Sequence, residues 1–293
     1  MNWEEQLIQL YCDVCQLYHD ELWQYCERFS NNALPKFTDE EVITIYLFGI
    51  IRKRFDVTQI FKYTRDHLRS WFQTLPSYGG YVQRLNKLSA VFPPLLNALA
   101  PKWGGPKVNL AVLLDSMPMI LARGSRRFQA KVARELADCG YCSSKQLAYY
   151  GLKLHVLGIR QPGTLPHPDY IELTSARPHD IMVLEGIWPF LRHGELYADK
   201  AYASEVLEAL MAYQEMRLLS PTKKAKGQEK LHLFDQLWST SVSRVRQPIE
   251  SLFNWFEQKT GIQIASKVRS VNGLLVHVYG RLAAAMYMLS FNS

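Results

Sequence analysis

The chain has 293 residues, of which 48% are hydrophobic and 21% are charged, with 16 glycines and 14 prolines. This composition is typical of a folded globular protein and excludes a fibrous or disordered chain. A formal net charge of +7 favours an anionic partner, and the length fits a small domain joined to a larger one.

The sequence also argues against export and against membrane insertion. Its first residues, MNWEEQLIQL, lack the basic start and the apolar run of a signal peptide. The longest apolar run, residues 42–51, is about half of the ~20 residues that a membrane-spanning helix needs. Five cysteines are an odd number, which argues against a disulfide framework. We therefore expect a cytoplasmic protein that makes no membrane contact.

Four of the cysteines form two C-x-x-C pairs, Cys12 with Cys15 and Cys139 with Cys142. A four-thiolate zinc site is one interpretation. The pairs lie much farther apart than the ~15–20 residues usual between the halves of a zinc ribbon. Packing of Cys12 and Cys15 on a helix, as small apolar side chains, is the simpler interpretation.

Residues 1–105 predict a small helical domain. Thr38 and Glu41 have the spacing of a capping box just before an apolar run, which indicates a helix start. Segments 56–72 and 81–92 predict further helices. Short helices of this kind fit either a helix-turn-helix DNA reader or a plain packing domain. The turn-forming segment PKWGGPK, residues 101–107, marks the boundary with a second domain, residues 106–293.

The periodicity changes after this boundary. Residues 108–115 are almost continuously apolar, as in a buried strand, and residues 149–158 alternate, with His155 on the polar face. Residues 169–176 predict a third strand. A helix at 179–192, a strand at 195–199, a helix at 204–216 and a short strand from 216 follow. This order predicts an α/β fold with a mixed sheet.

Two of these strands end in an acid. Asp115 follows VLL and Asp199 follows LYA. An isolated carboxylate at the end of a buried strand needs a hydrogen bond, an ion-pair partner or a metal ion. Each acid taken alone is typical of a turn or a helix cap. Two of them on similar strand ends favour a metal site, because open α/β sheets gather ligands at their strand ends.

Glu250 is the candidate for a third acid. Apolar residues at 242, 245, 249, 252, 253 and 256 recur at helical spacing, and Glu250 lies beside this stripe. Arg246 is four residues earlier, so an ordinary surface ion pair is the alternative interpretation. Pro248 requires the helix either to begin near it or to bend there.

Four segments together resemble the catalytic domain of DDE transposases encoded by bacterial insertion sequences. They are LLDSMP, YYGLKLHVLG, ADKAY and VRQPIESLFNW, in that order, within a likeness that covers roughly residues 108–291. The resemblance implies an RNase H-like mixed sheet flanked by helices, after a small all-helical N-terminal domain. It implies that Asp115, Asp199 and Glu250 are the catalytic triad and the metal ligands.

The Tyr-Arg-Glu-Lys signature of this family is matched in part. Arg246 stands four residues before Glu250, but Ser243 replaces the tyrosine. Glu257 occupies the lysine position, with Lys259 two residues later.

The resemblance implies a transposase that cuts DNA at terminal inverted repeats and joins the 3′ ends to target DNA. This phosphoryl transfer would use Mg²⁺ or Mn²⁺, as two ions. A homodimer on DNA in the bacterial cytoplasm, associated with the nucleoid when bound, is also implied. Two alternatives remain open: a catalytically inactive or accessory DNA-binding protein, and an RNase H-like nuclease without strand transfer.

Basic residues are expected to contact DNA phosphates around such a site, although a solvated basic face is the simpler interpretation of their clustering. These candidates are Arg123, Arg126, Arg127, Lys131, Lys200, Lys223, Lys224, Arg244, Arg246, Lys259, Lys267 and Arg269. His155, His179 and Asp180 are candidates for the edge of the site. A satisfied hydrogen bond for the histidines and a helix cap for Asp180 are the simpler interpretations.

Overall fold

The computed structural model describes residues 2–26, 35–105, 110–142, 145–224, 227–228 and 230–291. The chain divides into two compact units. One consists of Met1–Pro101 together with Phe256–Ser293, and the other of Lys102–Trp255. The first division therefore lies close to the expected boundary at 105. The C-terminal residues, however, belong to the helical unit and not to the second domain in which they were expected.

The helical unit is built around one buried helix. α2 (Asp39–Ile51) starts at a capping box in which Thr38 and Glu41 exchange side chain to backbone hydrogen bonds, so the predicted helix start is confirmed. Residues 42–50 are buried on all sides of α2, as expected for a helix at the centre of a domain. It packs against α1 (Trp3–Asp20), α3 (Val57–His67), α4 (Tyr78–Lys87) and α11 (Arg281–Phe291).

The C-terminal segment joins this unit because its last helix is almost wholly buried there. Residues 282–287 of α11 are each at most 3% exposed, and α11 packs against α2 and α5 (Phe92–Leu99). The side chain of Arg281 donates hydrogen bonds to the carbonyls of Thr260, Gly261 and Phe55. The shorter elements of the unit are η1 (Leu22–Tyr25), η2 (Ser89–Val91), α10 (Val271–Leu275) and the π-helical η5 (Val276–Gly280).

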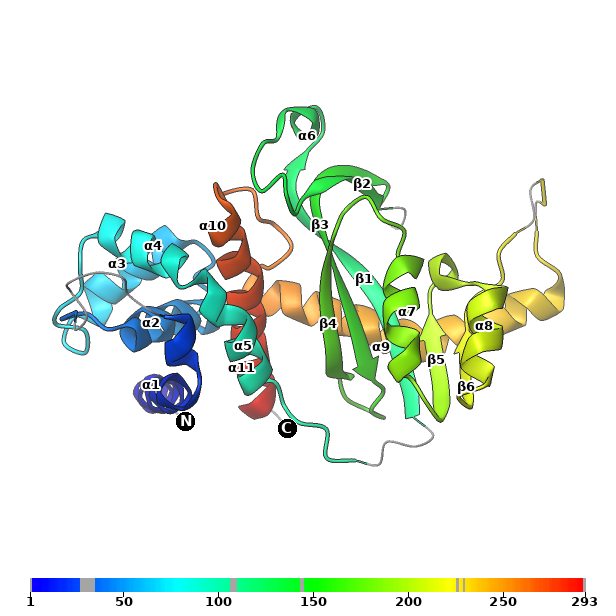
Figure 1. Cartoon of the computed structure of the whole chain (residues 1–293), viewed down its shortest axis with the longest axis horizontal. Coiled ribbons are helices and arrows are strands. Elements are labelled where there is room, and N and C mark those ends of the chain that lie inside the picture. The colour runs from blue at the N-terminus through cyan, green and yellow to red at the C-terminus, as the bar shows by residue number, and fades with distance from the viewer. Residues whose placement is uncertain are drawn as a thin grey trace. The chain divides into compact units, whose positions relative to one another are not determined.

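The second unit contains a mixed sheet, as predicted (Figure 1). Its strands are β1 (Leu110–Arg123), β2 (Asp138–Cys142), β3 (Leu147–Ile159), β4 (His167–Ser175), β5 (Gly194–Ala198) and β6 (Met216–Leu219). The order is β2-β3-β1-β5-β6, and β4 also pairs with β3. β1 is antiparallel to β3 and parallel to β5, which is parallel to β6.

β2 is a strand that the sequence did not predict. It pairs with the first part of β3, and β4 pairs with the rest of β3 along the same edge. Gly140 allows this arrangement, because a Cβ there would lie 2.3 Å from the carbonyl oxygen of Ala176. Cys139 and Cys142 lie on β2, whereas Cys12 and Cys15 lie on α1 in the other unit. Cys12 is exposed, so the packing interpretation is wrong for that residue.

Helices cover both faces of the sheet (Figure 1). α7 (Ile181–Ile187), η3 (Trp188–Phe190) and α8 (Glu205–Ala212) pack with β1, β5 and β6 around one apolar cluster. On the opposite face runs α9 (Leu233–Thr260), whose residues up to 255 belong to this unit. Ile249 of α9 lies against β3 at Gly158, where a Cβ would meet it at 3.2 Å.

The buried stripe expected on α9 is confirmed for Val242, Ile249, Leu252, Phe253 and Phe256, while the side chain at 245 is half-buried. Pro248 lies inside the helix, so α9 does not begin there. Among the described residues, no helix combines the length and the apolar character needed to cross a membrane.

Candidate active site

The register of the two parallel strands places the first two acids next to each other. Leu114 of β1 is paired with Ala198 of β5, and these residues immediately precede Asp115 and Asp199. Neighbouring strands of a sheet lie about 4.8 Å apart. Asp115 and Asp199 therefore directly follow the last paired residues of β1 and β5, at the same level of the sheet.

Only one of these acids stands at a strand end. β5 stops at Ala198, one residue before its predicted end at Asp199, but β1 continues to Arg123 because its other edge pairs with β3. Asp115 is opposite Val156 in the middle of this long strand. The expectation that Asp115 ends a strand is therefore wrong, since pairing with β3 extends β1 beyond its apolar run.

The backbone fixes one oxygen of each acid. The amide of Ser116 donates to Oδ1 of Asp115, and the amide of Lys200 donates to Oδ1 of Asp199, both at 2.8 Å. Asp199 also caps the 3₁₀ turn η4 (Lys200–Tyr202). Tyr202 at the end of this turn is fully buried and anchors it to the core. Both carboxylates are thus held in defined orientations by groups one residue away.

Arg246 connects the third acid to the first. Its Nη1 donates to Oδ2 of Asp115, and its Nη2 donates to Oε1 of Glu250 at 2.7 Å. Arg246 and Asp115 are only 12% and 18% exposed, whereas Glu250 is 53% exposed. Arg246 therefore does not form an ordinary surface pair with Glu250 alone, because it also contacts a mostly buried acid on a distant strand.

The acids influence one another electrostatically. The pKa of Asp115 is raised to about 6, mainly by burial and to a smaller extent by the charges of Asp199 and Glu250, while Arg246 and the Ser116 amide oppose the shift. Within the described part of the chain, Nε of Arg246 is buried without a hydrogen-bond partner. Arg246 contacts two of the three carboxylates, and the net negative charge of the three acids favours an additional cation.

The chemistry of the three acids fits a divalent ion, but their arrangement does not yet form a coordination sphere. Carboxylate oxygens are the ligands that Mg²⁺ and Mn²⁺ prefer. Across residues 2–291, outside the gaps named above, no three acid, histidine or cysteine side chains stand close enough to hold a metal. Arg246 makes the contacts to Asp115 and Glu250 that a metal ion would replace.

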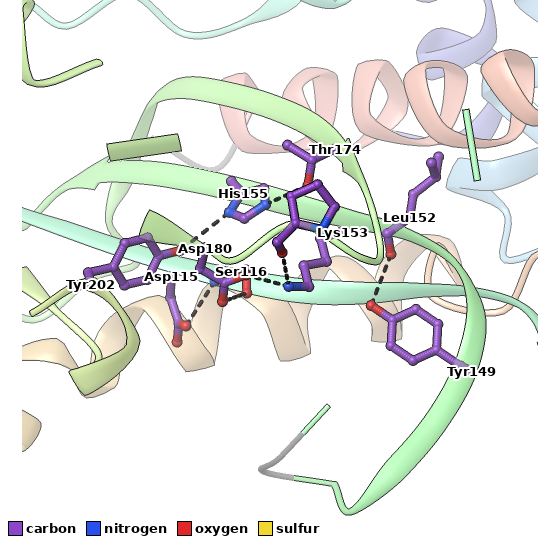
Figure 2. A network of polar contacts seen from close by, with 10 residues as sticks. Asp115, Ser116, Tyr149, Leu152, Lys153, His155, Thr174, Asp180 and Tyr202 are labelled. Atoms are coloured by element: carbon purple, nitrogen blue, oxygen red, sulfur yellow. Dashed lines mark hydrogen bonds and ion pairs between the residues drawn. The ribbon is translucent and has the colours of Figure 1, made fainter. Parts of the chain in front are cut away.

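A second polar cluster adjoins Asp115 (Figure 2) and contains Asp180, a predicted candidate for the edge of the site, whose partners Ser116 and Lys153 were not predicted. Asp180 accepts hydrogen bonds from Oγ of Ser116 at 2.9 Å and from Nζ of Lys153 at 2.6 Å. Lys153 also donates to the carbonyl of Pro178 at 2.8 Å. Asp180 stands at the N-cap position of α7, as the cap interpretation expects, but its side chain makes no capping hydrogen bond. The polar position of Lys153 within an apolar strand was the available signal.

His155 is part of the core behind the site. It is 1% exposed, and its ring nitrogens lie 3.3 Å from Oη of Tyr202 and 3.0 Å from Oγ1 of Thr174 (Figure 2). The face of β3 that carries His155 is buried and not solvent-exposed, because Tyr202 of η4 contacts His155 there. The interpretation as a satisfied hydrogen bond is confirmed. Burial lowers the pKa of His155, which therefore stays neutral. The other candidate histidine, His179, is exposed.

The predicted DNA-contacting cations fall into several groups. Lys200 is exposed beside Asp199, and Nζ of Lys223 donates to the carbonyl of Ala203 after the same turn. Lys224 and Arg244 are also exposed, the latter on α9 two residues before Arg246. Four other cations lie at the far end of β1 and after it. They are Arg123, Arg126, Arg127 and Lys131.

Three predicted cations belong to the helical unit, apart from the unit that contains the acids. Lys259 is in the last turn of α9. Lys267 pairs with Asp56 at 2.6 Å, and Arg269 donates to the carbonyls of Ser266 and Val268. Glu257, at the lysine position of the signature, accepts the backbone N–H of Gln263 at 2.7 Å.

Comparison with known proteins agrees with this geometry. The family model described as transposase DDE domain matches residues 107–270, which is more than half of the chain and includes all three acids. No curated protein matches the chain, and no solved structure does. The mixed sheet flanked by helices is the RNase H-like fold expected for a DDE domain. The chain belongs to the family of transposases with a DDE domain.

Proposed function

We propose that this transposase cuts DNA at the terminal inverted repeats of its element and joins the resulting 3′ ends to target DNA, with Asp115, Asp199 and Glu250 as its catalytic acids. The observation that carries the proposal is the alignment of Asp115 with Asp199 across the β1/β5 ladder. The link from Asp115 to Glu250 through Arg246 supports it. Three acids far apart in the sequence thereby share one electrostatic environment.

Asp115, Asp199 and Glu250 would hold Mg²⁺ or Mn²⁺, as two ions. Bound there, the ions would supply Lewis-acid chemistry that activates a hydroxyl nucleophile and stabilises the leaving oxygen of a phosphodiester. The amides of Ser116 and Lys200 keep the two aspartates oriented for this role. Arg246 neutralises Asp115 and Glu250, and if ions were held by these carboxylates its guanidinium would be available for a phosphate.

Exposed cations around the acids would hold the DNA. Lys200 follows Asp199 directly, and Arg244 lies on the same helix as Glu250. Contacts between such cations and phosphates give affinity that falls with salt and give no choice of sequence. The enzyme would act as a homodimer that holds two element ends, in the bacterial cytoplasm and on the nucleoid when bound to DNA.

The experiment compares cleavage with binding. Purified protein is incubated with Mg²⁺ or Mn²⁺ and a plasmid that carries the element with its flanking DNA. Asp115→Asn, Asp199→Asn and Glu250→Gln should each lower cleavage by at least about 10³-fold, while duplex affinity stays within about threefold. Asp235→Asn, on the same helix as Glu250, is the matched control and should cut normally. Cleavage retained by any of the three variants removes that residue from the triad.

The two alternative functions give different results in the same assay. An accessory DNA-binding protein would bind the plasmid and leave it uncut with every divalent ion. A nuclease without strand transfer would cut, but would not join pre-cleaved 3′ ends to a second duplex. Joined products that disappear in Glu250→Gln would support the transposase.

A further inference from the structure

The segment that connects β1 with β2, residues 124–137, presents an exposed aromatic ring. It contains the short helix α6 (Arg126–Gln129), which projects beyond the end of the sheet (Figure 1). Phe128 on this helix is 71% exposed. The guanidinium of Arg127 lies over its ring, 4.1 Å from the ring centroid. A single exposed aromatic needs no explanation by itself, so its surroundings decide what it does.

Those surroundings are strongly basic. Between residues 123 and 134 the sequence has five cations and no acid: Arg123, Arg126, Arg127, Lys131 and Arg134. All except Arg127 are exposed. An apolar protein partner would gain little from so many like charges, whereas a DNA backbone complements them. An exposed phenyl ring contacts DNA favourably when it stacks on a base.

The segment is held firmly enough to present the ring. Gly124 adopts φ +58° and reverses the chain after β1. The backbone N–H of Phe128 donates to the carbonyl of Ser125 at 3.3 Å. The hydroxyl of Tyr150 on β3 donates to the carbonyl of Val132 at 2.9 Å, and Ala133 is buried. Phe128 therefore stands on a support that is fixed to the sheet.

The distance from the catalytic acids defines where the ring meets DNA. Asp115 and Arg123 lie on the same strand, and eight residues of strand span about 25 Å at about 3.3 Å per residue. At 3.4 Å per base pair this equals about 7 base pairs of duplex. The ring thus lies too far from the acids to stack on the base at the cleaved bond, and it would meet paired DNA farther along.

We propose that Phe128 is a wedge that inserts between stacked base pairs of the DNA being cut, about 7 base pairs from the cleaved bond. The flanking cations hold the phosphates on both sides of the opened step, in the way that Arg residues accompany apolar wedges in proteins that kink DNA. The cut DNA is the partner because one continuous strand, β1, carries both Asp115 and the basic segment. This inference rests on the proposed function, since that function places DNA at Asp115.

The test measures the preference for DNA whose stacking is already weakened. Binding to a 30-base-pair duplex of arbitrary sequence is compared with binding to the same duplex containing two adjacent central mismatches. Full-length wild-type protein should bind the mismatched duplex about 10-fold more tightly, because a wedge loses less stacking energy there. Phe128→Ala should lose the preference and Phe128→Trp should keep it. Neither change should alter the melting temperature, because the side chain is exposed.

Two further variants separate stacking from charge. Phe234→Ala removes another highly exposed ring of the same unit, next to Asp235, and should leave the preference unchanged. Arg126→Gln should weaken binding to both duplexes equally. It should also lower the slope of the logarithm of the binding constant against the logarithm of the salt concentration by about the amount that one phosphate contact contributes. An equal loss for both duplexes in Phe128→Ala would show a general contact and overturn the wedge.

The remaining outcomes are also decisive. The inference is overturned if the wild type binds both duplexes equally, or if Phe128→Ala changes the mass measured by sedimentation, which would place the ring in a protein interface. Asp115→Asn should keep the mismatch preference after losing cleavage. If the triad variants still cut DNA while the mismatch preference of the wild type is observed, the proposed function alone would be contradicted. If the triad variants lose cleavage while the wild type shows no mismatch preference, the wedge alone would be contradicted.

Discussion

Replacing Arg246 by methionine tests the electrostatic account of the site most sharply among single substitutions. Arg246 neutralises Asp115 in a contact where the two side chains are 12% and 18% exposed. Removing one partner of a fully buried ion pair costs about 3–5 kcal/mol, because the other charge remains without a partner. The partial exposure of both groups reduces this to about 2–3 kcal/mol, and the contact with the more exposed Glu250 adds less than about 1 kcal/mol.

The assay is a double-mutant cycle. The free energy of unfolding is measured in urea with EDTA for the wild type, Arg246→Met, Asp115→Asn and the double variant. Arg246→Met should destabilise the wild type by about 2–3 kcal/mol and the Asp115→Asn background by less than about 1 kcal/mol. Mg²⁺ should raise the melting temperature of Arg246→Met more than that of the wild type, because the arginine no longer competes for the carboxylates.

Glu250→Gln is the matched control for this cycle. It removes the exposed half of the same arginine bridge and should cost less than about 1 kcal/mol. An Arg246→Met penalty of the same size with and without the Asp115 charge would refute the reasoning, because it would show that Arg246 stabilises the protein through packing.

Three other predictions concern the sheet and its polar core. Gly151→Ala should destabilise the protein by more than about 3 kcal/mol, because its Cβ would lie 1.9 Å from the carbonyl oxygen of Met119. Gly186→Ala in α7, where a Cβ would enter open space, should stabilise the protein by about 0.5–1 kcal/mol. Similar melting temperatures for the two variants would contradict both expectations. His155 has a folded-state pKa of about 4, below its value of about 6.5 in the unfolded chain, so the protein should lose stability as the pH falls from 6.5 towards 4, by about 1.4 kcal/mol per unit. His155→Asn should remove this part of the slope, and an unchanged slope in urea titrations would count against a neutral buried imidazole. Asp180→Asn leaves the ammonium of the mostly buried Lys153 without its counter-charge and should lower the free energy of unfolding by about 2–3 kcal/mol. Adding Lys153→Met should recover most of this loss. No recovery in the double variant would contradict the pairing of the two side chains.

The sequence allowed the local elements to be predicted well, because their signals are local. The capping box of Thr38 and Glu41 marked the start of α2, and the apolar stripe around Ile249 marked the buried face of α9. The acid at 199 was placed correctly at the end of β5.

Features that depend on distant pairing could not be predicted in the same way. Asp115 lies in mid-strand because β3 extends β1, and no pattern within residues 108–115 encodes that partner. The burial of α11 in the helical unit depends on apolar surfaces of α2 and α5, which a single segment does not reveal.

The candidate site shows the same contrast. Its three acids were chosen from local patterns and a family resemblance, and the β1/β5 register brings two of them to the same level. The contact of Arg246 with Asp115 spans 131 residues, and that of Lys153 with Asp180 spans 27. Only tertiary structure discloses such pairs, because side chains of this type have many possible partners.

The position of bound Mn²⁺ tests the central claim most directly. Crystals grown with Mn²⁺ would give anomalous difference density at the metal. The account predicts a peak contacted by carboxylate oxygens of both Asp115 and Asp199, with Glu250 alongside and the guanidinium of Arg246 withdrawn from Asp115. Strong density elsewhere in the protein, with the Arg246 bridge intact and these carboxylates without metal, would contradict it.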